Sequence, residues 1–104
     1  MASKATIKQV TDFVKQVNAC GIHLNKVILY GSYARNKQTK YSDIDVALVA
    51  DEFSGVPAED VKLFIKAMRN YYMVQAQTYN TKDFTPEKDP FVKEILQTGI
   101  EIKA

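Results

Sequence analysis

Two short groups of residues near the middle of the chain have the types and the spacing that phosphate and metal chemistry requires. Gly31-Ser32 is followed, after ten intervening residues, by Asp43-Ile44-Asp45. Glycine has no Cβ, so the backbone at Gly31 can come close to a ligand, and the Ser32 hydroxyl can donate to a phosphate oxygen. If Ser32 also begins a helical turn, the free N–H groups of that turn point at an anion. The first group therefore predicts a phosphate-binding turn.

Asp43 and Asp45 form the second group, a pair of carboxylates. Two residues apart on a strand, they share one face, with Cα atoms about 6.5–7 Å apart. Carboxylates this close repel each other when both are ionised, and a hard divalent cation relieves that repulsion. Mg²⁺ is commonly held by one or two carboxylates together with substrate phosphates. Each group alone is a weak signal, but together they predict metal-assisted transfer to or from a nucleoside triphosphate.

Strands are expected to position both groups. Residues 26–30 (KVILY) form a continuous apolar run that ends at Gly31, which is typical of a buried strand. Residues 43–50 (DIDVALVA) begin with alternating acidic and apolar residues, so one face carries both aspartates while the other enters the core. Residues 73–79 predict a third strand, and 100–102 a short last one.

Helices are expected between these strands. Apolar spacing predicts a helix over residues 4–19 and another over 90–98, which begins with Asp89 as N-cap and ends with Gly99 as the C′ residue. A further helix opens near Pro57. Its predicted buried stripe is Val61, Phe64, Ile65 and Met68. The sequence thus predicts an α/β (α+β) domain with helices packed on a small sheet.

Composition limits the class of protein. A chain of 104 residues predicts one domain over residues 1–104. A net charge of +2 gives no case for nonspecific nucleic-acid binding. The absence of an apolar run of about 18 residues predicts no membrane span, and we expect a cytoplasmic protein.

Single residues outside the motif are expected to be structural. Cys20 is the only cysteine and is expected to be a small buried thiol. The only histidine, His23, is expected to be structural or merely exposed. Aromatic residues are expected to pack in the core or at element ends rather than to stack on a base: Phe13, Phe64, Phe91, Tyr71, Tyr72 and Tyr79.

The GS-x(10)-D-x-D pattern resembles that of the DNA polymerase β-type nucleotidyltransferase superfamily. The segment GSYARNKQTKYSDIDVALV is similar, more closely, to the minimal nucleotidyltransferase domains of prokaryotes, and so is the ending PFVKEILQTGIEI. Such domains are often encoded beside a HEPN-domain partner as a toxin–antitoxin pair. The resemblance implies a small mixed sheet flanked by helices, Mg²⁺, and a nucleoside triphosphate, with ATP as the expected donor. It also implies transfer of adenylyl groups onto the HEPN toxin.

By position, the resemblance implies that Gly31 and Ser32 bind the triphosphate, and that Asp43 and Asp45 bind metal and act in catalysis. Arg35 falls where the family usually has arginine. It could contact phosphate, or it could brace the loop by pairing with a carboxylate. Nearby, Lys37 and Lys40 either add local positive charge or belong to a solvated loop.

Two positions depart from the family's pattern. Asn36 replaces a usual glycine, although asparagine tolerates left-handed backbone better than most residues. Gln75 occupies the position of an expected third acid, with Gln77 as the next candidate. Glutamine cannot accept a proton at neutral pH, and loss of a positioned general base typically costs about 10²–10⁴-fold in rate. Whether Glu59, Asp60 or another acid replaces Gln75 is left open by the sequence.

Three hypotheses follow. The first is an active nucleotidyltransferase that modifies a partner protein. The second is a catalytically weak or inactive nucleotide-binding module that acts by binding a HEPN-type partner. The third is a structural α/β domain with a vestigial motif, which explains less well why both aspartates and the Gly-Ser turn keep their spacing.

Overall fold

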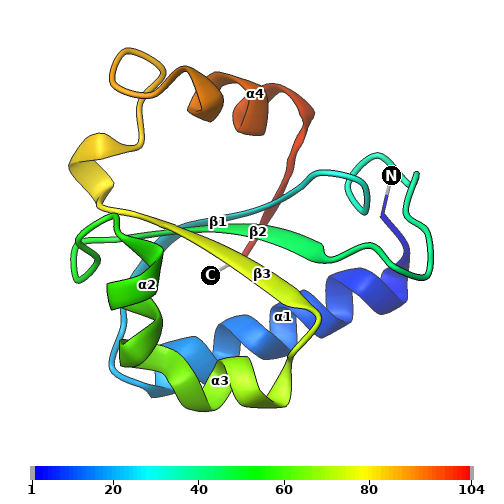
Figure 1. Cartoon of the computed structure of the whole chain (residues 1–104), viewed down its shortest axis with the longest axis horizontal. Coiled ribbons are helices and arrows are strands. Elements are labelled where there is room, and N and C mark those ends of the chain that lie inside the picture. The colour runs from blue at the N-terminus through cyan, green and yellow to red at the C-terminus, as the bar shows by residue number, and fades with distance from the viewer. Residues whose placement is uncertain (1, 104) are drawn as a thin grey trace.

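A computed structural model describes residues 2–103, which form a four-stranded mixed sheet with helices on both faces (Figure 1). The strand order is β3-β2-β1-β4, in which β2 and β3 are parallel and the other pairs are antiparallel. This architecture confirms the predicted fold class. In chain order the elements are α1 (Lys4–Ala19), β1 (Leu24–Tyr30), β2 (Ile44–Ala50), α2 (Pro57–Asp60), the 3₁₀ turn η1 (Val61–Phe64), α3 (Ile65–Asn70), β3 (Val74–Tyr79), the 3₁₀ turn η2 (Thr81–Asp83), α4 (Pro90–Thr98) and β4 (Ile100–Ile102).

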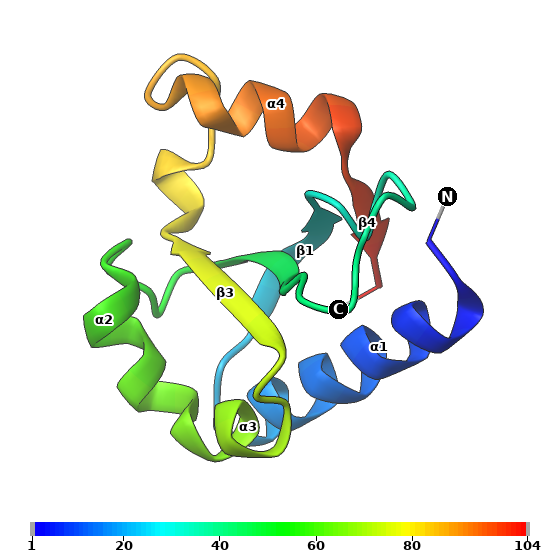
Figure 2. The same cartoon turned by 45° about the vertical axis from the view of Figure 1, so that its right-hand side comes forward.

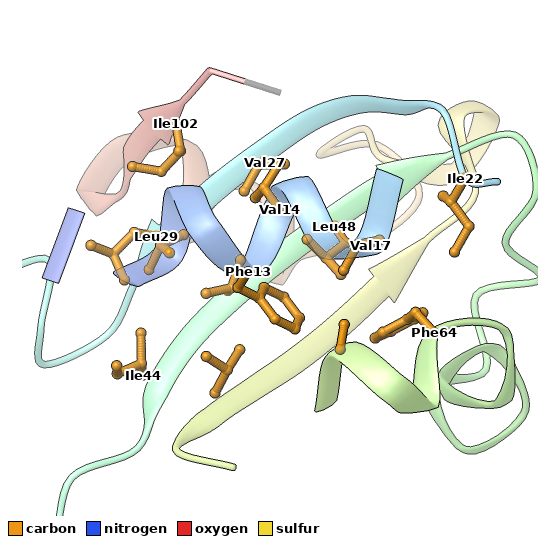
Figure 3. Close-up of a cluster of buried hydrophobic side chains, with 14 of the residues drawn as sticks. Phe13, Val14, Val17, Ile22, Val27, Leu29, Ile44, Leu48, Phe64 and Ile102 are labelled. Atoms are coloured by element: carbon orange, nitrogen blue, oxygen red, sulfur yellow. The ribbon is translucent and has the colours of Figure 1, made fainter. Parts of the chain in front are cut away.

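The larger core lies between the sheet and the helices α1 and α3. Figure 3 shows Phe13, Val14 and Val17 of α1 directed toward side chains of the central strands. Alternate residues of β1 and β2 supply the sheet side of this core, which includes Val27, Leu29, Ile44, Val46 and Leu48, all nearly or fully buried. We call this side of the sheet the packed face.

The opposite side of the sheet faces α4, and we call it the α4 face. Figure 2 shows the sheet between α4 on one side and α1 with α3 on the other. The core here is smaller. Its buried residues are Ile28, Ala47, Val49, Tyr79, Val92 and Ile95.

Local capping explains why two predicted helices have the expected bounds. Ser3 caps α1 by accepting a hydrogen bond from the Thr6 amide at 3.1 Å. Asp89 caps α4 by accepting from the Phe91 amide at 3.0 Å, and Pro90 occupies the first turn, where a missing N–H costs nothing. Within residues 2–103, no helix combines the length and apolar character needed to cross a membrane.

The sequence predicts one continuous helix after Pro57, and this prediction is wrong. The segment consists of α2, η1 and α3. Asp60 and Val61 keep helical angles where α2 passes into η1, whereas Phe64 leaves the helical conformation, with φ −136° and ψ 35°, and separates η1 from α3. The break rotates the buried stripe. Ile65, expected in the core, is 42% exposed, and Ala67 is fully buried in its place.

Gly99 also differs from its predicted role. It does follow α4, but its backbone is extended, with φ −86° and ψ 170°, rather than left-handed. A Cβ at this position would collide with the Ile28 side chain and the Ile95 carbonyl oxygen. Glycine is needed here because α4 turns into β4 against the sheet with no room for a side chain.

The solvent exposure of several side chains differs from what the sequence predicts. Cys20 is exposed rather than buried. Tyr72 is 84% exposed and Phe91 43% exposed, whereas both were expected to pack. The other aromatic expectations are confirmed: Phe13 and Phe64 are fully buried, Tyr71 packs edge-on against Phe13, and Tyr79 packs against Phe84.

Candidate active site

The predicted site residues gather where β1 ends and where β2 and β3 begin. Tyr30 of β1 pairs in register with Asp45 of β2, and Asp45 pairs in turn with Gln75 of β3. Directly paired residues project to the same side of a sheet. Because Val46 lies in the packed face, this row of three residues lies on the α4 face.

Gly31 sits at the end of β1 in contact with this row. Its φ is +75°, a region that side chains disfavour. A Cβ there would also collide with the Asp45 carboxylate. The residue must therefore be glycine for the turn that follows it, the predicted phosphate-binding turn, to pass directly beside Asp45.

The turn after Gly31 is one turn of helix, as the sequence predicts. The Arg35 amide donates to the Gly31 carbonyl at 3.3 Å, and the Lys37 amide donates to the Ser32 carbonyl at 2.8 Å. Within residues 2–103, the amides of Ser32, Tyr33 and Ala34 donate to no protein acceptor. Three free N–H groups at the start of a helical turn form a concavity that favours an anion.

Asn36 ends this turn in a left-handed conformation, with φ +57°. Asparagine is one of the few residues other than glycine that adopt this conformation readily. The structure confirms that the loop keeps its left-handed position without the usual glycine.

The two carboxylates lie at the start of β2. Asp43 is exposed just before the strand, and Asp45 is half-buried within it. Burial raises the pKa of Asp45, and the negative charge of Asp43 raises it further. Within residues 2–103, no ion pair neutralises either group.

These observations permit a test of whether Mg²⁺ fits. A cation would relieve the repulsion between the two aspartates. Among the described residues, no three Asp, Glu, His or Cys side chains group closely enough to hold a metal by themselves. The donor set is therefore two carboxylates, with the remaining ligands left to substrate phosphate and water, as is common for Mg²⁺.

The position expected for a third acid is filled by an amide. Gln75 is exposed directly beside Asp45, and Gln77 is half-buried beside Ala47. Asp60 does not replace the missing acid. Its carboxylate is buried elsewhere and accepts hydrogen bonds from Ser54, Gly55 and Thr78 at 2.6–3.0 Å. Those bonds more than offset burial, which alone would raise the pKa, so the pKa of Asp60 is lowered.

Arg35 is exposed and, within the described part of the chain, forms no ion pair with a carboxylate. The bracing alternative is therefore not seen, and the guanidinium is free to contact a ligand. Lys37 and Lys40 are both exposed, and Lys40 lies 5.1 Å from the centre of the Tyr41 ring, which is 83% exposed. These two lysines match the alternative of a solvated loop.

A cleft of about 200 Å³ opens beside Asp45, between the sheet and α4. It is lined by Tyr30, Gly31, Arg35, Asp45, Phe91, Glu94, Ile95 and Thr98. The Tyr30 and Phe91 rings meet nearly edge-to-face, with centroids 5.7 Å apart. Burial, followed by the charges of Asp45 and Tyr79, raises the pKa of Tyr30 to about 12, so its hydroxyl stays protonated at neutral pH.

Sequence reasoning assigned no role to the α4 side of this cleft. Periodicity predicts which face of α4 is apolar, but it does not say which part of the sheet that face meets. The signal that could have placed α4 was the short predicted strand after Gly99. If that strand pairs with β1, as β4 does, the helix before it must lie near the end of β1.

Comparison with known proteins gives consistent results. A family model described as "Nucleotidyltransferase domain" matches residues 7–101. Among solved structures, the chain is similar to a protein from Sulfolobus solfataricus that carries the provisional name of a nucleotidyltransferase. The TM-score is 0.62 at 17% identity, over 93% of this chain and 78% of that one. At this identity the likeness concerns the fold. No curated protein matches the chain.

Proposed function

This chain belongs to the nucleotidyltransferase domain family, and from that premise we propose that it transfers a nucleotidyl group from a Mg²⁺-bound nucleoside triphosphate to a partner protein. The observation that carries the proposal is the contact between Gly31 and Asp45, which joins the phosphate-binding turn to the carboxylate pair. Neither half alone would favour nucleotidyl transfer.

Each residue has a stated part in the proposed reaction. The free amides after Gly31 and the Ser32 hydroxyl bind the triphosphate, and Arg35 contacts a phosphate oxygen. Asp43 and Asp45 hold Mg²⁺, which supplies charge neutralisation for the phosphates and the leaving group. The acceptor oxygen bonds to the α-phosphorus, the bond from that phosphorus to the bridging oxygen breaks, pyrophosphate leaves, and the acceptor proton passes to solvent.

ATP is the proposed donor, and a HEPN-domain toxin is the proposed acceptor, with the chain acting as its antitoxin in the cytoplasm. The support is the similarity of residues 31–49 to minimal nucleotidyltransferase domains. A separate acceptor protein also suits the exposure of Asp43, which leaves this end of the sheet accessible from outside.

A transfer assay tests this proposal. We expect ATP labelled at the α-phosphate, with Mg²⁺ and the HEPN partner, to leave label on the partner, whereas ATP labelled at the γ-phosphate leaves none. The variant D43N/D45N should abolish labelling, and Asp51→Asn, an exposed aspartate after β2, should not. No labelling by the wild type, or labelling unchanged in D43N/D45N, would refute the proposal.

Gln75 favours a second candidate function, in which the chain binds nucleotide and its partner with little turnover. Under this alternative, Asp43→Asn abolishes nucleotide binding but leaves toxin neutralisation intact. Under the first proposal, Asp43→Asn ends both. Gln75→Glu adds a further distinction, because restoring a base beside Asp45 should raise the transfer rate, by as much as about 10²–10⁴-fold where proton removal is limiting.

A further inference from the structure

We propose that the cleft between α4 and the sheet binds the nucleobase of the donor, with Tyr30 and Phe91 as its aromatic wall and Glu94 as the acceptor for an exocyclic amino group. The inference rests on the proposed function, because it assigns the cleft to the same ligand whose phosphates lie on the Ser32 turn. Gly31 lines both places, so one molecule can occupy them together.

The size of the cleft suits part of a ligand rather than a whole one. Pockets that enclose a complete small molecule commonly measure about 300–1,000 Å³. The cleft measures about 200 Å³. It is therefore a subsite for one ring system, with the rest of the ligand lying on the turn outside it.

The aromatic wall explains why Phe91 is not buried. Phe91 lies in the first turn of α4, a helix that packs on the sheet, yet its side chain is 43% exposed. The ring is held by an edge-to-face contact with Tyr30 while still lining the cleft. A base that stacks on such a ring covers apolar surface that water otherwise contacts, and any base can do so because each has a π-face.

The α4 side of the cleft carries a carboxylate, which disfavours a phosphate and suits a group that donates hydrogen bonds. In the proposed function Asp45 and Arg35 serve Mg²⁺ and phosphate, so the carboxylate that remains for the rest of the ligand is that of Glu94. Within residues 2–103, the Glu94 carboxylate has no ion-pair partner, and only its backbone carbonyl is used, by the Thr98 hydroxyl at 2.8 Å. An ionised carboxylate accepts hydrogen bonds and donates none. A base with an exocyclic amino group, such as adenine, supplies the missing donor, whereas uracil has no amino group.

Calorimetric titration of the full chain with three Mg²⁺ complexes tests the inference: those of ATP, UTP and inorganic tripolyphosphate. The variants are Phe91→Ala, Phe91→Leu as a version that keeps apolar packing, and Glu94→Met, which keeps side-chain length without an acceptor. Leu96→Ala is the matched control, because Leu96 is 44% exposed on the same helix but does not line the cleft. Thermal melts of each variant establish that it is folded.

We expect Phe91→Ala to weaken ATP about 5- to 100-fold, with Phe91→Leu in between, because base–aromatic stacking is lost. Tripolyphosphate, which has no base, should bind all variants as it binds the wild type. Glu94→Met should reduce the preference for ATP over UTP by about 2- to 10-fold. Leu96→Ala should change none of these affinities.

The outcomes separate this inference from the proposed function. If the wild type binds tripolyphosphate and ATP but neither Phe91 variant affects ATP selectively, the base subsite is wrong and the proposed function stands. If the wild type binds neither complex, both proposals fail.

Discussion

The two faces of the sheet use the same strands for different purposes. On the packed face, α1 and α3 cover the strands with an extensive apolar core that includes Phe13 and Leu48. There even a buried carboxylate, that of Asp60, accepts hydrogen bonds at both of its oxygens. On the α4 face the core is small, and Asp45 lies near Asp43 with no ion-pair partner among the described residues. Because the packed face supplies most of the stability, the α4 face can retain two carboxylates that repel each other and an open cleft. A ligand-binding site needs both features.

The largest expected contrast comes from truncating one phenylalanine on each face. Phe13→Ala should lower the free energy of unfolding by about 3–5 kcal/mol, because Phe13 is fully buried and its removal leaves a cavity. Phe91→Ala should lower it by only about 1 kcal/mol, because the ring is already partly in water. Urea denaturation of the ligand-free chain measures both. Equal losses would mean that the two faces do not differ in their share of the stability.

A second variant breaks the hydrogen bonding of the packed face. The Thr78 hydroxyl donates to the Asp60 carboxylate at 2.6 Å, and both side chains are buried. Thr78→Val keeps the shape but removes this donor, and should cost about 1.5–3 kcal/mol in unfolding free energy. Thr98→Ala is the control, since the Thr98 hydroxyl is exposed on α4, and its change should stay within about 0.5 kcal/mol. A loss no greater than that of the control would contradict the role given to Asp60.

The contribution of the Asp60 carboxylate to the unfolding free energy should depend on pH. The folded-state pKa of Asp60 lies below its ordinary value, so the unfolded chain takes up a proton first as the pH falls. The stabilisation is therefore complete above the unfolded pKa, about 3.9, and is lost as the pH falls through the lower folded pKa. Unfolding free energies of the wild type and Asp60→Asn between pH 6 and pH 2 measure this contribution. The difference between the two proteins should shrink toward the acid end, and a constant difference would contradict the prediction.

The smallest expected effect lies in the loop after Gly31, which we propose binds phosphate. Asn36 has a left-handed backbone, so Asn36→Ala should cost about 1 kcal/mol of unfolding free energy, whereas Asn36→Gly should be nearly neutral. Affinity for Mg²⁺–ATP should follow the same order, because the loop carries the turn after Gly31. If Asn36→Ala reduced neither stability nor affinity, the loop conformation would not matter for the site.

Local signals in the sequence were enough to predict much of the fold. The helices α1 and α4 have the predicted bounds because each begins at a capping side chain. The break at Phe64 was not predictable from periodicity, because it depends on distant residues: the Phe64 ring packs against Phe13 and Phe53. Tertiary packing there overrides the local preference for one continuous helix.

The candidate site divides in the same way. The motif on β1 and β2 was predictable because a strand, a turn and a second strand lie close together in the sequence. The roles of Gly31, Ser32, Arg35, Asp43 and Asp45 stay predictions, although the structure brings these residues to one end of the sheet. The contribution of Phe91 and Glu94 could not be predicted, since it depends on where β4 pairs.

That pairing also makes the cleft depend on the last strand of the sheet. α4 is joined through Gly99 to β4, and β4 is held by register with β1, where Ile102 lies opposite Val27. Most of the packed face needs only residues up to Tyr79. Fraying of β4 from β1 would therefore release the α4 wall of the cleft and leave most of the packed face intact. The edge strand β4 thus couples a local opening of the sheet to the shape of the cleft.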